Sequence, residues 1–522
     1  MSKLQSAIDQ LDNASANIIV NRFDGGLNVS ESNEVLEDNE AIIRKNWATD
    51  NVGAIVKVNG HTKKNSSAIA SKPIRGLFRV YQSSGTKHLL AICNGTLYYS
   101  TDDGATFTAA TSGTGLTETV FNSGVNYNDL FLFTNATDNL KKYTVGTTTM
   151  ATPASVPTDP CRILLKRADR RLIALVNAVN GSTLYFSKVD PTGAAADDWS
   201  ATADAGSIAI DGAKSEPLTG GHTFGPVDII FKSYAAFRVW GYPSPQAQRM
   251  PGSPGCSAPQ STAQGDGLGF HLGHDGVWMF DGNKFIKISP PIEEIIDDIN
   301  PSYIQNAFGV YRDSLYWIFY TPSGQTVNTK CLIYDVAFSN PYVGKNIWYE
   351  RDGLSMNCPV IFNGEGDDNE IYAGTSANTG FVYRLDFSSA GADVTSDIEA
   401  IYQTKYFNGG KPTDPISHIV KRFSKIHITY FLATSTTNVR WYTNRGLTSG
   451  SFDLPLSQTG VALGIFVLGT DTLAENVERT HTERLPETAI GKDISLKFTH
   501  EGQGPAPIIR NVSIEFEALF EE

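Results

Sequence analysis

Three apolar and aromatic runs follow one another within residues 76–99: Gly76-Leu77-Phe78-Arg79-Val80-Tyr81, then Lys87-His88-Leu89-Leu90-Ala91-Ile92, then Asn94-Gly95-Thr96-Leu97-Tyr98-Tyr99. Turn-forming residues separate these runs, and each run has the length of a short β-strand. The same alternation of short apolar runs and turn-forming residues begins near Ile74 and continues to about Thr395, with little helical pattern between the runs. Closely spaced short strands of this kind predict an all-β fold, as a sandwich, a barrel or a propeller.

A longer repeat favours the propeller. An aliphatic residue followed by an aromatic residue recurs at intervals of 38 to 56 residues, with Lys in the aliphatic place once. A repeat of this length with about four strands is typical of propeller blades, which must pack face to face because one blade cannot bury both of its faces. The sequence therefore predicts about six or seven blades. The recurring pairs are Leu97-Tyr98, Lys142-Tyr143, Leu184-Tyr185, Val239-Trp240, Val277-Trp278, Ile333-Tyr334 and Val382-Tyr383.

The repeat ends after about Thr395, and alternating strands follow. Their solvent-facing charges predict a separate C-terminal antiparallel β-sandwich. We therefore expect an N-terminal segment (1–64) that packs on a platform, a propeller (65–395) and a C-terminal sandwich platform (396–522). The strands expected in the platform are Ala400–Tyr406, Lys425–Tyr430, Val439–Tyr442, Ile494–Phe498 and Val512–Glu517.

A few segments depart from this all-β pattern. Residues 32–47 predict one or two short helical turns, and Pro290–Ile299 predicts an amphipathic helix with Pro at its start. Two segments predict long projecting loops because of their composition, Val189–Gly206 (rich in Ala, Asp and Thr) and Tyr242–Gly255 (rich in Pro, Gly and Ser).

The amino-acid composition argues against some classes of function. Acidic residues outnumber basic ones by 55 to 42, which gives a net charge of −13 and argues against a domain that grips nucleic acid. This charge is compatible with a protein that lets DNA pass. Residues 1–20 show no secretory signal, and no run of 18 apolar residues predicts a membrane span. Five widely spaced cysteines without a CxxC motif predict buried free thiols in a reducing cytoplasm.

The sequence offers little support for an enzyme. Ser100–Phe107 matches the Asp-box pattern of sialidases and other propellers, but the same pattern is explained by a hydrogen-bonded hairpin, which we favour. The acidic residues of Glu293–Asp298 are best explained as a solvated helix face, and His271 and His274 would point to opposite faces of a strand. We therefore predict no catalytic, cofactor-binding or metal-binding residues.

Two charged segments are candidate contacts between copies of the chain. A basic segment could be a solvated strand edge or could meet an acidic surface, and an acidic segment in a neighbouring copy is the candidate partner. Another basic cluster opens the C-terminal part. The basic segment contains Arg162, Lys166, Arg167, Arg170 and Arg171; the acidic segment contains Glu31, Glu34, Glu37, Asp38 and Glu40; the C-terminal cluster contains Lys405, Lys411, Lys421, Arg422 and Lys425.

Several motifs occur in a characteristic order. They are Arg22-Phe23-Asp24-Gly25-Gly26-Leu27-Asn28; Leu36-Glu37-Asp38-Asn39-Glu40-Ala41; Asn46 and Gly53; Ile74-Arg75-Gly76-Leu77-Phe78; Leu89-Leu90-Ala91; Gly95-Thr96-Leu97-Tyr98; and Gly276-Val277-Trp278-Met279-Phe280-Asp281-Gly282 with Ile288-Ser289 and Ile292 behind it. In texture and order, most of the chain resembles the β-propeller tail nozzle or hub (DNA-stabilisation) proteins of short-tailed bacteriophages.

The resemblance implies a structural virion protein without catalytic residues. It implies a homo-oligomeric ring, commonly a hexamer, that sits below the portal and adaptor in the tail, contacts other tail proteins and is assembled in the host cytoplasm. The platform would surround a channel that DNA crosses without sequence-specific binding. Two alternatives stay open. One is a receptor- or glycan-binding propeller of a fibre or spike, with exposed aromatics such as Trp199 and Tyr242; the other, less favoured, is a sialidase-like hydrolase.

Overall fold

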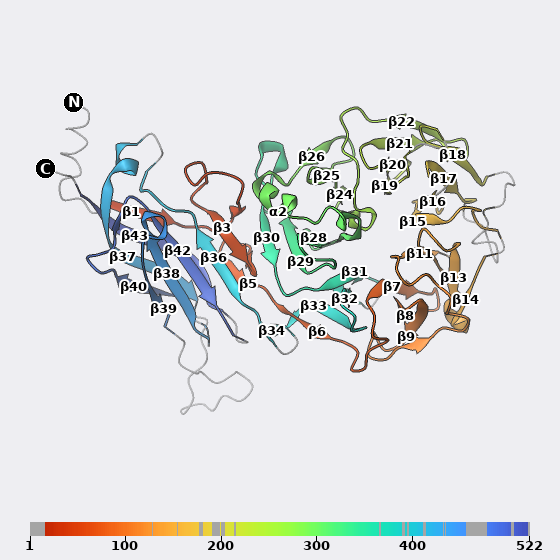
Figure 1. Cartoon of the computed structure of the whole chain (residues 1–522), viewed down its shortest axis with the longest axis horizontal. Coiled ribbons are helices and arrows are strands. Elements are labelled where there is room, and N and C mark those ends of the chain that lie inside the picture. The colour runs from red at the N-terminus through yellow and green to blue at the C-terminus, as the bar shows by residue number, and fades with distance from the viewer. Residues whose placement is uncertain are drawn as a thin grey trace.

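The computed structural model describes residues 16–519 except 128, 154, 177–180, 190–198, 200–203, 213–215, 365–366, 389–391, 394–395, 411–413, 432, 434, 456–477 and 503–505. Figure 1 shows a disc of radiating sheets on the right and a platform on the left. The disc is a β-propeller, and the platform contains strands from both ends of the chain. The predicted all-β class is therefore confirmed.

Five consecutive groups of four strands form separate antiparallel sheets in the described part of the propeller. In each sheet the strands lie in chain order, which is the arrangement of a propeller blade. The strands are β7 (Ile74–Tyr81), β8 (Lys87–Cys93), β9 (Thr96–Ser100) and β10 (Thr108–Ala109); β11 (Ser123–Tyr127), β12 (Leu130–Thr134), β13 (Lys141–Thr144) and β14 (Thr149–Ala151); β15 (Cys161–Lys166), β16 (Leu172–Val176), β17 (Thr183–Phe186) and β18 (Gly206–Ala209); β19 (Gly220–Phe224), β20 (Val227–Phe231), β21 (Ala236–Trp240) and β22 (Gln246–Arg249); β23 (Ala263–Gly265), β24 (Leu268–Leu272), β25 (Val277–Phe280) and β26 (Phe285–Lys287).

The sixth separate four-stranded sheet closes the propeller. Its strands β31 (Met356–Phe362), β32 (Glu370–Thr375) and β33 (Val382–Ser388) are joined by β6 (Gly60–Lys63), which precedes the first blade in sequence. One further four-stranded unit, β27 (Phe308–Arg312), β28 (Leu315–Tyr320), β29 (Lys330–Asp335) and β30 (Trp348–Arg351), lies between β23 and β31 and continues into the platform. The propeller thus has six separate blades and one four-stranded unit that it shares with the platform.

The recurring aliphatic and aromatic pair occupies the same place throughout. It lies on the third strand of every unit, on β9, β13, β17, β21, β25, β29 and β33. Its aliphatic member is fully buried wherever it is aliphatic, as at Leu97, Val277 and Val382. The repeat predicted from sequence therefore marks the strand whose side chains pack against the neighbouring blade.

Two sheets face each other in the platform, and strands from both ends of the chain build them. They enclose one apolar core that includes Phe23, Trp47, Tyr402, Phe423 and Phe498. The seven-stranded sheet contains β1 (Ala16–Val20), β4 (Trp47–Thr49), β5 (Ile55–Lys57), β37 (Val420–Phe431), β40 (Glu478–Arg484), β41 (Ile490–Gly491) and β43 (Ile508–Leu519); β2 (Gly26–Leu27), β3 (Glu40–Lys45), β36 (Ala400–Thr404), β38 (Thr437–Thr443), β39 (Thr448–Asp453) and β42 (Ile494–His500) complete the ten-stranded sheet that β27–β30 begin.

A two-stranded ribbon, β34 (Ala392–Asp393) and β35 (Ser396–Asp397), follows the propeller. The five strands predicted for the platform all form, and the structure adds β39, β40 and β41 to them. The domain boundaries at 64/65 and 395/396 stay predictions, with β6 just before the first and the ribbon across the second.

Two local predictions were wrong. The helical turns expected in 32–47 are replaced from residue 40 onward by β3 and β4, because β3 finds a partner strand in β36. The loop expected at Tyr242–Gly255 contains β22, which pairs with β21 and completes a blade in spite of its flanking prolines. The other expected loop, Val189–Gly206, falls largely outside the described residues.

The helix expected at Pro290–Ile299 forms in a shorter version. A 3-10 turn at Pro290–Ile292 leads into α2 (Glu293–Asp297), and the buried face carries Ile292, Ile296 and Ile299. All five cysteines are free and buried, as the sequence predicted.

Candidate assembly surfaces and the propeller–platform junction

The acidic segment folds onto its own platform. A turn with hydrogen bonds from Val35 N–H and Leu36 N–H to the Ser32 carbonyl shapes it, and Leu36 is buried. Glu34 Oε1 lies 2.5 Å from Arg445 Nη2, and Asp38 Oδ1 lies 2.6 Å from Lys405 Nζ. Two of its carboxylates are therefore already paired within the chain.

Glu40 has a structural role as well. Its Oε2 accepts a hydrogen bond from Glu37 N–H at 2.7 Å, and its Oε1 accepts one from Asn28 Nδ2 at 3.0 Å. Burial raises the pKa of the Glu40 carboxyl above its ordinary value, against the effect of these hydrogen bonds. Glu31 and Glu37 are exposed as well, so both are open to another molecule.

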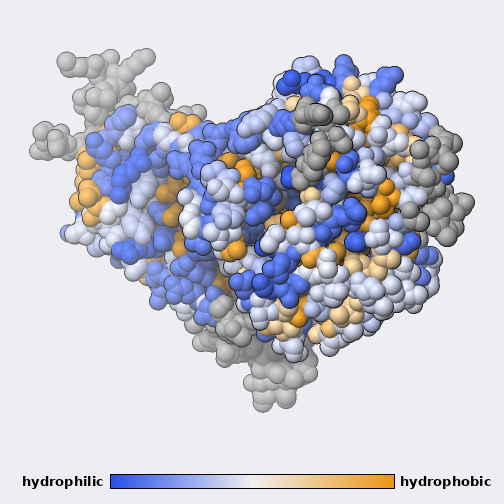
Figure 2. All heavy atoms as spheres, turned by 45° about the vertical axis from the view of Figure 1, so that its right-hand side comes forward, coloured by the Kyte–Doolittle hydropathy of each residue, from blue (hydrophilic) through white to orange (hydrophobic). Residues whose placement is uncertain are grey.

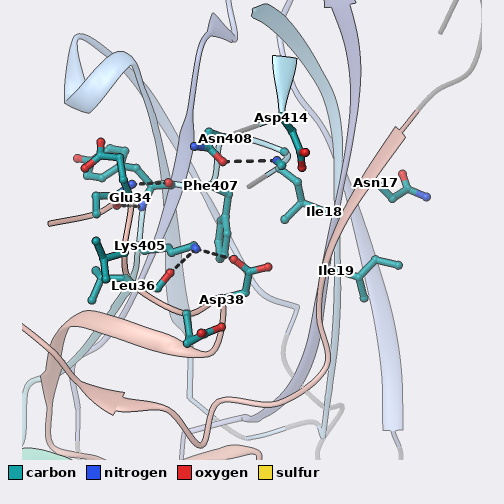
Figure 3. A pocket seen from close by; sticks show the side chains of 16 residues that line it. Asn17, Ile18, Ile19, Glu34, Leu36, Asp38, Lys405, Phe407, Asn408 and Asp414 are labelled. Atoms are coloured by element: carbon teal, nitrogen blue, oxygen red, sulfur yellow. Dashed lines mark hydrogen bonds and ion pairs between the residues drawn. The ribbon is translucent and has the colours of Figure 1, made fainter. Parts of the chain in front are cut away.

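A groove of about 660 Å³ lies between the acidic segment, β1 and residues 405–410 (Figure 3). Lys405 Nζ donates to the Leu36 carbonyl at 2.6 Å and also meets Asp38, which fixes one wall of the groove. Two exposed apolar side chains, Ile19 and Val35, line the groove beside these charges. The groove thus combines apolar and acidic surface.

Two of the basic segment's arginines are internal. The side chain of Arg167 forms an ion pair with Asp228, and its guanidinium carbon lies 4.5 Å from the centre of the Tyr242 ring. Arg171 donates to the backbone carbonyls of Ser187 and Asp204. Both arginines are buried, so they connect β-strands within the propeller and are not available to a neighbouring copy.

The other three basic residues differ in exposure. Arg162 is half-buried on the innermost strand of its blade, where burial lowers the pKa of its guanidinium. Lys166 and Arg170 are exposed at the end of β15 and in the turn after it. The structure does not bring the basic and acidic segments together within one chain, since β15 lies in the propeller and the acidic segment leads into β3 of the platform (Figure 1). Contact between copies stays a prediction, and Lys166, Arg170, Glu31 and Glu37 are among the exposed residues that could make it.

Figure 2 shows one face of the molecule on which hydrophilic side chains predominate and apolar ones are scattered. Exposed large apolar residues of the described chain come from separate elements, for example Val343 after β29 and Leu447 before β39. Contacts made by this face would therefore be largely polar.

The segment Arg22–Asn28 joins the two parts of the molecule. Phe23 is fully buried in the platform core, while Leu27, four residues later, is buried in a core that includes Ile288, Ile292 and Trp348. Two backbone hydrogen bonds continue the attachment, from Asn28 N–H to Ala41 and from Val29 N–H to Pro291. One short segment is thus anchored in two hydrophobic cores.

Glycine is required in this segment. Gly26 has a φ of +86°, and a Cβ there would lie 3.0 Å from Ile347 Cα. A Cβ on Gly25 would lie 2.6 Å from the Asn39 backbone. The Gly-Gly pair therefore allows the segment to pass between the propeller and the platform.

Asn46 also connects the propeller to the platform, through hydrogen bonds of its side chain. Its Oδ1 accepts hydrogen bonds from Arg351 Nη1 at 3.1 Å and Asp352 N–H at 2.9 Å, and its Nδ2 donates to the Glu399 carbonyl at 2.8 Å. Asn46 has a φ of +57°, a conformation that Asn tolerates better than most residues. These contacts of Asn46 cannot be predicted from its motif, because their partners Arg351, Asp352 and Glu399 lie about 300 or more residues away.

The Asp box at Ser100–Phe107 forms a hairpin turn that is held by side-chain hydrogen bonds. Asp102 Oδ1 accepts from Thr106 N–H at 2.9 Å and from Ser100 Oγ at 2.6 Å, and Asp102 Oδ2 accepts from Thr106 Oγ1 at 2.6 Å. Burial works against ionisation, but these hydrogen bonds outweigh it and lower the pKa of Asp102 to about 2. The favoured interpretation of this motif is therefore supported by its geometry.

Within the described ranges, no group of three or more His, Cys, Asp or Glu side chains is placed to hold a metal ion. His271 is buried and His274 is exposed against Tyr234, so the two histidines do not share a site. The described helices include none that is long and apolar enough to cross a membrane.

The fold and these surfaces define a β-propeller joined to a β-sandwich platform through a shared sheet. No protein-family model and no curated protein sequence matches the chain. Among solved structures, the computationally designed Ika8 protein matches at 7% identity and a TM-score of 0.39, over 62% of this chain and 99% of that one.

Two further matches are structures of YCF48. YCF48 from Cyanidioschyzon merolae matches at 10% identity and a TM-score of 0.39, over 62% of this chain and 98% of that one. A structure described as YCF48 bound to D1 peptide matches at 11% identity and a TM-score of 0.38, over 61% and 93%.

Proposed function

We propose that the protein is a structural component of a bacteriophage tail, a nozzle or hub ring that forms part of the channel for DNA ejection. Copies of the chain, six in the arrangement that the resemblance implies, would meet head to tail around an axis. The ring would contact the portal, the adaptor and other tail proteins of the virion. In such a ring each copy offers two different surfaces to its neighbours.

One observation carries the proposal. Two of the motif groups that carry the resemblance, Arg22–Asn28 and Gly276–Ile292, are about 250 residues apart in sequence. In the structure Leu27 shares one core with Val277, Ile288 and Ile292. In a tail protein of this kind the platform would hold the propeller in a fixed position. The motifs that carry the resemblance would then be expected to meet where the propeller joins the platform, as these two do.

The charge of the chain suits a channel. A protein gains affinity for DNA by neutralising phosphates and releasing counterions, which a net charge of −13 does not favour. DNA would then cross the ring without being held.

The two alternatives receive less support from the geometry. A glycan-binding propeller was expected to expose Trp199 and Tyr242, but Trp199 is only 9% exposed and Tyr242 packs against Phe186 and Arg167. The hydrolase alternative depended on the Asp box, and the Asp102 side chain of this motif accepts hydrogen bonds that stabilise the hairpin turn.

Native mass spectrometry of the full-length protein, mixed with the portal and adaptor proteins of the same virion, tests the proposal. We expect a discrete complex that contains several copies of this chain. A chain that stays monomeric in the presence of both proteins would contradict the proposal.

A further inference from the structure

Strand β1 (Ala16–Val20) has a free edge beside the groove of the platform. Among the strands that the structure describes, β1 pairs with β43 alone, over five consecutive residue pairs. In an antiparallel ladder, alternate residues turn their N–H and C=O groups away from the partner strand, so about half of these groups on β1 point to the free edge. An edge of this kind can accept a further strand.

The sequence of β1 does not protect this edge. Natural edge strands are protected by charged side chains, by proline or by a bulge. Strand β1 reads Ala-Asn-Ile-Ile-Val, without a charge or a proline, and its register with β43 has no shift. By contrast, β40 at the opposite edge of the same sheet carries four Glu and Arg residues among its seven. An uncharged and β-branched edge is therefore expected to be covered by a partner.

The groove gives room for a strand along this edge. Its volume is about 660 Å³, and in Figure 3 β1 lies on one side of it while Leu36, Asp38 and Lys405 lie on the other. A strand advances about 3.3 Å per residue, so an extended segment of about five residues spans the length of β1. Two residues of the platform core, Ile18 and Phe407, also line the groove, so apolar side chains of an added strand would meet the core.

The charge of the groove favours a basic partner. Its lining contains one lysine and four carboxylates, which are Lys405, Glu34, Glu37, Asp38 and Asp414. If Arg445, which pairs with Glu34 from outside the lining, is included, carboxylates still outnumber cations by four to two. Glu37 is exposed, and no ion pair joins it to a residue in the described part of the chain. A positively charged segment would therefore gain from electrostatic attraction here.

We propose that the groove binds an extended segment of another protein, in which basic and apolar residues alternate, as an added strand on β1. Main-chain hydrogen bonds to the free edge supply affinity, and the side chains of the segment supply specificity. Apolar side chains contact the core at Ile18 and Phe407, and basic side chains meet the carboxylates, of which Glu37 is accessible. The groove lies within one chain, so the proposal does not depend on the proposed ring.

A second copy of this chain is a less suitable occupant. An added strand must be extended over the whole length of the edge that it covers. The exposed cations of the basic segment, Lys166 and Arg170, lie at the end of β15 and in the turn after it. They do not form an extended basic strand that could lie along β1.

Calorimetric titration of the full-length protein with the peptide acetyl-Lys-Val-Arg-Ile-Lys-Val-Arg-amide tests the proposal. We expect saturable binding with a dissociation constant on the order of 10 to 100 µM. A control peptide with proline in place of the isoleucine and the second valine has the same charge but lacks two backbone donors. It should bind at least about tenfold more weakly, because proline cannot take part in a strand ladder at these positions.

Two variants of the protein test the two parts of the groove. Ile19→Lys places a charge on the edge strand and should weaken binding of the peptide about tenfold. Glu37→Gln removes one exposed charge and should weaken binding about threefold. The matched controls are Val343→Lys and Glu294→Gln, which change an exposed apolar and an exposed acidic residue far from the groove and should leave binding unchanged. Thermal unfolding of each variant shows whether the fold is intact.

Amide hydrogen exchange of residues 16–20 separates strand addition from attraction by charge alone. The N–H groups of β1 that face the free edge should exchange more slowly when the peptide is bound. The proposal is overturned if the peptide shows no saturable binding, if the proline peptide binds equally well, or if exchange in β1 does not change on binding.

Two further outcomes would assign the edge to a different occupant. If all N–H groups of β1 exchange slowly before the peptide is added, the edge is already covered and the proposal is overturned. If native mass spectrometry shows a dimer of the parent protein that Ile19→Lys dissociates, the groove belongs to a second copy, which also overturns it.

Discussion

Asp367 connects the last blade of the propeller to the first. It belongs to the last blade, and its carboxylate receives Arg79 Nη2 at 3.0 Å, Tyr81 Oη at 2.8 Å and Lys87 Nζ at 3.0 Å from the first blade. The side chains of Arg79 and Asp367 are 3% and 6% exposed. This cluster therefore joins the two blades that are farthest apart in sequence.

Replacing Asp367 with Asn should lower the free energy of unfolding by about 2 to 3 kcal/mol, because Arg79 would lose one of its two carboxylate partners. Burial opposes ionisation of Asp367, but the hydrogen bonds outweigh it and lower the pKa to about 2 from 3.8. A lowered carboxyl pKa stabilises the fold above the unfolded pKa, and the stabilisation is lost as the pH falls toward 2.

Urea unfolding at several pH values measures this effect. The difference between the parent protein and Asp367→Asn should be constant above about pH 5 and should shrink below pH 4. A difference that does not change with pH would show that the carboxylate charge is not the stabilising feature.

Gly26 allows a second prediction at this scale. Gly26→Ala should destabilise the protein by about 2 to 3 kcal/mol, because the new Cβ adds crowding against Ile347 to the strain of a positive φ. Gly85 is the matched control, since its φ is +85° and nothing lies within 4 Å of the Cβ position.

Thermal and urea unfolding of both variants make the comparison. Gly85→Ala should cost only about 1 kcal/mol, which is the strain without the crowding. Equal losses in the two variants would mean that the close passage of residues 25–26 contributes nothing beyond backbone strain.

Among the elements, those with a local pattern were predicted from sequence and those that depend on distant partners were not. The third strand of each blade was predicted because its buried aliphatic residue and turn recur, as at Val277 and Ile333. Strand β3 was predicted as helical turns because its pairing with β36 is invisible in its own sequence. Strand β22 was hidden by the prolines around it.

The contacts of the charged segments could not be predicted from the sequence for the same reason. Charge clusters were visible in the sequence, but the internal partners of Arg167 and Arg171 were not, because Asp228, Ser187 and Asp204 lie 16 to 61 residues away.

Strand β6 closes the propeller by pairing with β33, where Lys63 lies opposite Tyr383. Directly opposed residues of antiparallel strands have Cα atoms close enough for a disulfide. The pair Lys63→Cys and Tyr383→Cys should therefore cross-link under mild oxidation and stabilise the fold by about 2 to 4 kcal/mol.

Unfolding of this double variant with and without reductant measures the gain. Thr62→Cys with Tyr383→Cys is the control, because residue 62 is one position out of register and its side chain points to the other face. If the control pair forms a disulfide as readily as the pair at positions 63 and 383, the register in which β6 pairs with β33 is contradicted.

At the scale of the whole molecule, one ten-stranded sheet runs from the propeller into the platform, through the pairing of β30 with β3 at Glu350 and Lys45. Phe23 and Leu27 add an attachment to both cores. We expect the two parts to unfold together, so calorimetry should show a single transition. Two separate transitions would contradict a rigid junction.

We propose that copies of this chain form a ring around a channel. The most direct measurement is electron microscopy of the protein assembled with its portal and adaptor partners. We expect end-on class averages with rotational symmetry, a central hole bounded by the platforms, and propellers at the periphery. Single separate propellers, or a closed particle without a central hole, would contradict it.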